Sequence, residues 1–247
     1  MKIFKWFLLA LQFLTIIPTV PFRDVDDRDM HYSVMFFPAV GLLLGAIVWL
    51  VMKAAALIFA PEIAAFFALA ALTLLTGMLH LDGVMDVADA LGSRKGKADA
   101  LVIMKDSHVG AIGAGAGMLL LLGKFVALAD LSVAHIGFFL VPPMVSRLGV
   151  VWIMAVSPSA RAGRGLSGFY AQKIPVTALM VASVYVLIAA FWWLNWQFAL
   201  LDIGLLVGAV AIYHFVMTKK FGGMTGDMYG AFNELMEWVL FTLGAMR

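Results

Sequence analysis

Long runs of apolar residues, separated by short polar segments, divide this chain of 247 residues into regular blocks. A helix of about 20 apolar residues crosses a hydrocarbon core of roughly 30 Å, so runs of this length are candidate membrane spans. Lipid offers no partner for backbone polar groups, and the runs lack the period-two alternation of barrel strands, so we expect helices. The predicted spans are residues 34–59, 63–81, 109–129, 135–156, 176–194 and 198–216.

The two ends of the chain are less clear. Residues 3–20 and 231–246 are largely apolar but carry polar side chains, so either segment could span, re-enter or lie in the interface. We therefore predict an all-α, polytopic integral membrane helix bundle with six to eight membrane-embedded helices. It forms a single membrane-embedded domain over residues 1–247.

Composition supports this class. The chain is 64% hydrophobic and only 13% charged, with a mean hydropathy of +1.00, which a soluble domain with a hydrated surface does not reach. The absence of cysteine excludes disulfides, thiolate metal sites and cysteine nucleophiles. Lipid is thus an expected partner and nucleic acid is not, while nothing argues against a homo-oligomer.

Lysine and arginine are distributed unevenly among the predicted loops. The connections around Pro61, around Asp130 and at residues 195–197 contain neither, whereas the alternate connections carry most of them. Positively charged loops stay in the cytoplasm. We therefore expect the basic loops to be cytoplasmic, including the loop after residue 81 with Arg94, Lys95, Lys97 and Lys105.

Four aspartates gather in that same region. Asp82, Asp86 and Asp89 stand at positions i, i+4 and i+7, which places them within an arc of roughly 60° on one helix face, and Asp106 follows. Neighbouring carboxylates repel one another unless a cation or protons lie between them. Hard oxygen ligands favour Mg²⁺ or Mn²⁺. The alternative is that Asp82 caps a helix and the others form its hydrated face.

Other charged residues receive simpler interpretations. The acidic run at residues 24–29 and Asp99 are expected to be solvated surface, and Lys53 and Lys124 to snorkel to the outer boundary. Arg147 lies inside an apolar span, where it either contacts substrate phosphate or pairs with an aspartate. His80 and His108 flank the acids, and both are secondary candidates for phosphate donors or proton carriers.

Glycines and two further loops complete the pattern. Gly41 with Gly45 is expected to let helices approach closely, and the run from Gly110 to Gly117 to pack a helix behind the acids. Pro142 and Pro143 should bend their span into a cavity wall. The loops at residues 157–173 and 219–234 combine glycine, hydroxyls and cations, and the second adds Asp227 as a candidate carboxylate.

Several of these segments resemble the cobalamin synthase family, adenosylcobinamide-GDP ribazoletransferase. The resemblance rests on HLDGVMDVADALGSR, IMKDSHVGAIGA, PPMVSR and GGMTGDMYGA, in the family's order. It implies a Mg²⁺-dependent enzyme in the cytoplasmic (inner) membrane of a bacterium, with its active site facing the cytoplasm. Such an enzyme transfers the cobinamide-phosphate group of adenosylcobinamide-GDP to α-ribazole or α-ribazole 5′-phosphate and releases GMP.

Roles for the residues follow from that resemblance. Asp82, Asp86 and Asp89 would hold the metal, and Asp106 would complete its coordination or accept the hydroxyl proton, which makes Asp82 and Asp106 the expected catalytic pair. Substrate phosphate would meet a second set of residues: Arg94, Lys105, Arg147, Asp227 and His80.

Two alternatives use similar carboxylates. A CDP-alcohol phosphotransferase-like enzyme for lipid head groups runs related chemistry, but the spacing of Asp82, Asp86 and Asp89 differs from that pattern. A divalent-cation transporter should carry its acids near the bilayer midplane rather than beside a basic loop.

Overall fold

The computed structural model describes residues 2–22, 24–161, 170 and 173–246, and this part of the chain is helical without a β-strand. The helices are α1 (Lys2–Leu14), α2 (Asp27–Ser33), α3 (Phe37–Ala55), α4 (Pro61–Leu75), α5 (Leu79–Gly92), α6 (Lys97–Ile103), α7 (Ala111–Asp130), α8 (Gly137–Val156), α10 (Val176–Trp193), α11 (Trp196–Phe221) and α12 (Gly226–Gly244). A short 3₁₀ turn, Val34–Phe36, joins α2 to α3.

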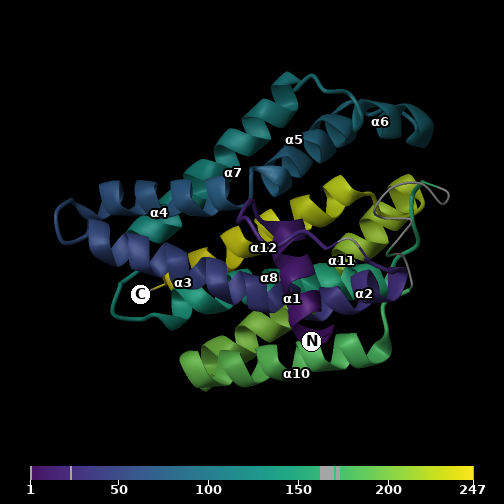
Figure 1. Cartoon of the computed structure of the whole chain (residues 1–247). Helices are drawn as coiled ribbons and strands as arrows, with labels where there is room; N and C mark the ends of the chain where they lie inside the picture. The colour runs from purple at the N-terminus through teal and green to yellow at the C-terminus, as the bar shows by residue number, and fades with distance from the viewer. Residues whose placement is uncertain (1, 23, 162–169, 171–172, 247) are drawn as a thin grey trace.

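Five of the described segments are long and apolar enough to cross a membrane. They are Asp27–Ala55, which contains α2 and α3, and the helices α7, α8, α10 and α11; α4 and α5 together count as a sixth if the pair is one broken span. Figure 1 shows α3, α4, α8 and α10 running in roughly one direction, with α5, α6 and the beginning of α7 at the top. The predicted all-α, multi-pass architecture is confirmed.

Helix α8 lies at the centre of the bundle, with most of its residues buried. Two glycines of α3 allow the closest approach to it. A Cβ atom on Gly41 would stand 2.1 Å from the carbonyl oxygen of Pro143, and one on Gly45 would stand 2.4 Å from that of Phe139. The expected packing role of these glycines is confirmed, because any side chain there would push the two backbones apart.

The predicted span at residues 63–81 is wrong as a single straight helix. The chain breaks after α4, where Gly77 and Met78 both adopt a φ of 59°, and α5 continues at 86° to α4. Left-handed residues end a helix because its hydrogen-bond ladder cannot pass through them. Asp82 therefore lies in the first turn of a new helix rather than at the end of an old one.

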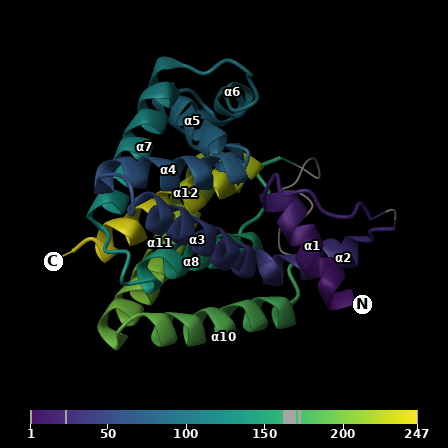
Figure 2. The same ribbon diagram turned by 60° about the vertical axis from the view of Figure 1, so that its left-hand side comes forward.

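The acidic run at residues 24–29 and the C-terminal segment also differ from expectation. The acidic run is not all solvated: Asp26 caps α2, and Asp29 is buried, accepting hydrogen bonds from Lys5 and from the indole of Trp6. At the other end, α12 begins five residues before the predicted segment. Figure 2 shows α12 running behind α4 and α3, and most of its residues are buried.

The contact of α3 with α8 generates a stability prediction. We expect Gly41→Val to lower the thermal unfolding midpoint of the detergent-solubilised protein markedly, since overpacking at a tight contact costs about 1–3 kcal/mol or more. The matched control is Gly208→Val on α11, where a Cβ meets nothing within 4 Å. Equal midpoints for the two variants in a thermal melt would contradict the close approach.

Candidate functional site

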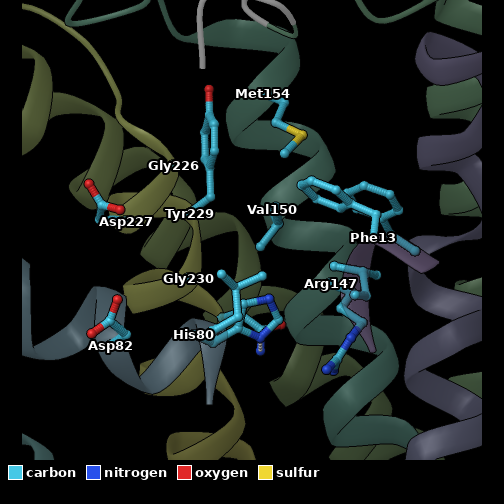
Figure 3. Close-up of a pocket in the computed structure, with 14 residues that line it drawn as sticks. Phe13, His80, Asp82, Arg147, Val150, Met154, Gly226, Asp227, Tyr229 and Gly230 are labelled. Carbon is cyan, nitrogen blue, oxygen red and sulfur yellow. Dashed lines mark hydrogen bonds between the residues drawn. The ribbon is translucent and has the colours of Figure 1, made fainter. Parts of the chain in front are cut away.

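Two glycines bring α5 and α12 together. A Cβ atom on Gly83 of α5 would lie 2.5 Å from the carbonyl oxygen of Asp227, and one on Gly230 of α12 would lie 3.0 Å from the Cα atom of His80. This close crossing places Asp82, in the first turn of α5, beside Asp227, in the first turn of α12. Figure 3 shows their two carboxylates on the same side of a pocket.

Asp86 joins these two residues, one turn further along α5. The charges that act on its half-buried carboxylate are those of Asp82, Asp227 and Asp89, offset by Arg161. We call Asp82, Asp86 and Asp227 the acidic cluster. Asp227, predicted only as an additional carboxylate in a loop, is thus brought next to the acids of α5.

Among the described residues, Arg161 is the cation that forms a salt bridge with the acidic cluster, and the sequence interpretation had treated it only as part of a basic loop. Its Nη2 atom lies 3.9 Å from Oδ2 of Asp227, which also accepts a hydrogen bond of 3.3 Å from Thr225 Oγ1. The rest of the loop that was expected at residues 157–173 falls largely outside the described residues, at 162–169 and 171–172.

Asp89 has a different environment from the acidic cluster. Its two oxygens accept hydrogen bonds from the backbone N–H groups of Gly110 and Gly113, at 2.7 and 2.8 Å, so it caps the N-terminus of α7. A Cβ atom on either glycine would collide with this carboxylate. The glycines do pack α7 behind the acids, as expected, while the metal-binding role of Asp89 stays a prediction.

Asp106 lies in the turn after α6. Its side chain is 58% exposed, and it pairs with His108, whose ring Nδ1 lies 2.7 Å and whose backbone nitrogen 3.0 Å from Oδ1. These hydrogen bonds hold the pKa of Asp106 below its usual range. Arg94 and Lys105 are exposed at the ends of α5 and α6 and form no salt bridge with any described residue. Their predicted roles remain untested.

A cavity of about 110 Å³ extends from Asp82 and Asp227 into the bundle. In Figure 3 the two acids lie on one side, Arg147 and Phe13 on the other, and His80 between them. Side chains from α1, α3, α5, α8 and α12 line it. Helix α8 contributes Arg147, Val150 and Met154 to the lining, whereas Pro142 and Pro143 do not line the cavity, so the predicted bend at these prolines stays a prediction.

Buried ion pairs lie at the inner end of this cavity. Lys124 of α7 donates to Glu234 and Glu237 of α12, at 2.6 and 2.7 Å, and Arg147 of α8 donates to Glu237 at 2.6 Å. We call these four side chains the ion network. The prediction that Lys124 snorkels is wrong, since α12 supplies two carboxylates inside the bundle. Arg147 has a structural partner, which is a glutamate rather than the expected aspartate.

Among the described residues, no group of three or more histidine, aspartate or glutamate side chains forms a ready-made metal cage. Mg²⁺, however, usually keeps several waters and takes only one or two carboxylates together with substrate phosphate. The acidic cluster fits that requirement, because within the described residues its three carboxylates face one arginine, Arg161, and a divalent cation would neutralise the remaining negative charge.

Comparison with known proteins gives a consistent result. A sequence model described as cobalamin-5-phosphate synthase matches residues 6–245. The chain is 38% identical to the adenosylcobinamide-GDP ribazoletransferase of Brevibacillus brevis, over 95% of each chain. It is 33% identical to that of Caldanaerobacter subterraneus, over 98% of each, and 36% identical to that of Chlorobaculum tepidum, over 96% of this chain and 93% of the relative. No solved structure matches.

The ion network generates a prediction about stability. Lys124→Met should lower the unfolding midpoint strongly, because removing one partner of a buried ion pair leaves an uncompensated charge and costs about 3–5 kcal/mol. Lys53→Met on α3 is the matched control, since Lys53 is exposed and lies over the ring of Trp49. Thermal melts in detergent measure both variants. A Lys124→Met protein as stable as the control would refute the network.

Proposed function

The chain belongs to the cobalamin-5-phosphate synthase family and is a ribazoletransferase of cobalamin biosynthesis, and we propose that its acidic cluster holds the metal for that reaction. The observation that carries the proposal is the convergence of Asp82, Asp86 and Asp227 from two helices, with Asp82 and Asp227 lining a cavity. The similarity spans nearly the whole chain, which favours this function over a lipid head-group enzyme or a cation transporter.

The substrates are those that the relatives' name implies: adenosylcobinamide-GDP as donor and α-ribazole or its 5′-phosphate as acceptor. A hydroxyl oxygen of the ribazole attacks the phosphorus attached to cobinamide, the pyrophosphate bond breaks, and GMP leaves with the bridging oxygen. When bound, Mg²⁺ would neutralise the pyrophosphate and the departing GMP.

The chain's own residues then have separate tasks. Asp82 lines the cavity as well as belonging to the acidic cluster, so its carboxylate is placed to take the proton of the attacking hydroxyl. Together with Asp86 and Asp227, Asp82 would also hold the metal. Arg161, beside Asp227, is placed to meet donor phosphate, and Arg94 and Lys105 add positive charge on the exposed side of the same region.

Substitutions in the acidic cluster test the proposal. Asp82→Asn and Asp227→Asn should each lower Mg²⁺-dependent GMP release from adenosylcobinamide-GDP with α-ribazole at least about 100-fold, because each removes a charge that faces the metal. The control is Asp99→Asn, an exposed aspartate of α6. Near-normal release by either variant, at any Mg²⁺ concentration, would exclude the metal assignment.

The orientation of the site in the membrane is a further part of the proposal. The chain contains no cysteine, so single cysteines can report sidedness directly. With the acids facing the cytoplasm, an impermeant maleimide applied to intact cells should label Ser132→Cys, between α7 and α8, but not Lys95→Cys, between α5 and α6. Lys95→Cys should react only after permeabilisation. The opposite pattern would invert the topology.

A further inference from the structure

The inner part of the cavity contains polar atoms that lack a partner within the described chain. Arg147 is almost fully buried, and its Nε and Nη2 atoms donate to no described residue, while Nη1 is shared by Glu237 and the carbonyl of Pro143. Asn233 is also fully buried, and its Oδ1 atom accepts no hydrogen bond from a described residue. Both side chains line the cavity. Because buried polar groups nearly always have partners, a bound molecule is expected to supply them.

Asn233 is held in one orientation. Its Nδ2 atom lies 3.3 Å from Glu237 Oε1, which can only accept, and 3.1 Å from Nδ1 of His80. The amide nitrogen therefore donates to His80 Nδ1, which must be the unprotonated nitrogen of a neutral ring. The free Oδ1 is then an acceptor, and the free nitrogens of Arg147 are donors. A hydroxyl group can accept from one and donate to the other.

The charges around the cavity favour an uncharged group at its inner end. In the ion network the two cations, Lys124 and Arg147, balance the two carboxylates, Glu234 and Glu237. The mouth carries the negative charges of Asp82 and Asp227. An anion without its own cation would find no net positive charge at the inner end and would be repelled by Asp82 and Asp227 at the outer end. Hydroxyl groups, in contrast, would find matching hydrogen-bond partners.

Most of the remaining wall is apolar, and Tyr229 adds a further buried hydroxyl that has no partner among the described residues. The apolar part is formed by the side chains of Phe13, Leu14, Phe37, Leu79, Val150 and Met154. The space of about 110 Å³ is many times the roughly 10–15 Å³ that one water needs, so it admits a group larger than water. Aromatic and aliphatic surfaces of this kind suit a planar apolar ring.

We propose that this cavity binds the acceptor nucleoside, with its apolar base against Phe13, Phe37 and Val150 and its ribose hydroxyls between Arg147 and Asn233. The inference rests on the proposed function. The attacking hydroxyl then faces Asp82, and the donor binds on the opposite side of the acidic cluster, towards Arg161. Specificity for the acceptor and binding of the donor are therefore governed by different residues.

Steady-state kinetics of the full-length protein in liposomes separate these two sites. Val150→Phe fills the cavity, so the KM for α-ribazole should rise at least tenfold while the KM for adenosylcobinamide-GDP changes less than twofold. The matched control is Val156→Phe, the same change on an exposed position of the same helix, which should leave both constants unaltered. An unchanged KM for α-ribazole, or a larger effect on the donor, would overturn the proposal.

A second measurement uses the unmodified chain and is independent of whether Val150→Phe folds. α-Ribazole carrying a diazirine on its base should, after irradiation, label peptides that contain Phe13, Phe37 or Val150, and excess α-ribazole should suppress the label. Labelling confined to the connections outside the helices would reject the cavity as the acceptor site. Wild-type GMP release in the same liposomes distinguishes this failure from a failure of the proposed function, which would abolish release altogether.

Discussion

The pairing of buried charges on α12 is the constraint on which the rest of the structure depends. Glu234 and Glu237 are buried in the bundle, and ionised carboxylates in such surroundings must be paired. Lys124 of α7 and Arg147 of α8 form ion pairs with them from two different helices. These pairs fix the rotation of α12 about its axis and its position along that axis. Asp227 lies seven and ten residues before these glutamates, which is roughly 10–15 Å along the helix axis, so its position is fixed as well.

The second requirement is that Asp82 reach the same place from α5. A straight continuation of α4 would carry Asp82, Asp86 and Asp89 along the line of an apolar helix, away from α12. The left-handed residues Gly77 and Met78 turn the chain by 86° instead. Gly83 then lets α5 rest directly on the backbone of Asp227. The acidic cluster thus results from one bend, one close helix contact and one ion network.

The sequence predicted the features that depend on consecutive residues and missed those that depend on contacts between distant residues. Apolar run length gave the spans, and the spacing of Asp82 and Asp86 placed both on one helix face, because period and length are properties of consecutive residues. The partners of Lys124, Arg147 and Asp29 lie far away in the sequence, and no periodicity reports them. The bend at Gly77 and Met78 was missed because the hydropathy of an apolar run does not report where the helix changes direction. Arg161 was indistinguishable from other loop cations until Asp227 was located beside it.

The position of the cavity also bears on why the reaction transfers a group to a nucleoside rather than to water. Either a hydroxyl group or a water molecule could attack the same phosphorus. On the inner side of the acidic cluster, however, the walls include the apolar side chains of Phe13, Phe37, Leu79 and Val150, which offer no hydrogen bond to water. An acceptor that fills this space with an apolar base brings its own hydroxyl and displaces competing water at the same time. Exclusion of water is a recognised means of preventing hydrolysis of reactive intermediates. A bundle of membrane helices supplies such an apolar wall directly beside a charged surface.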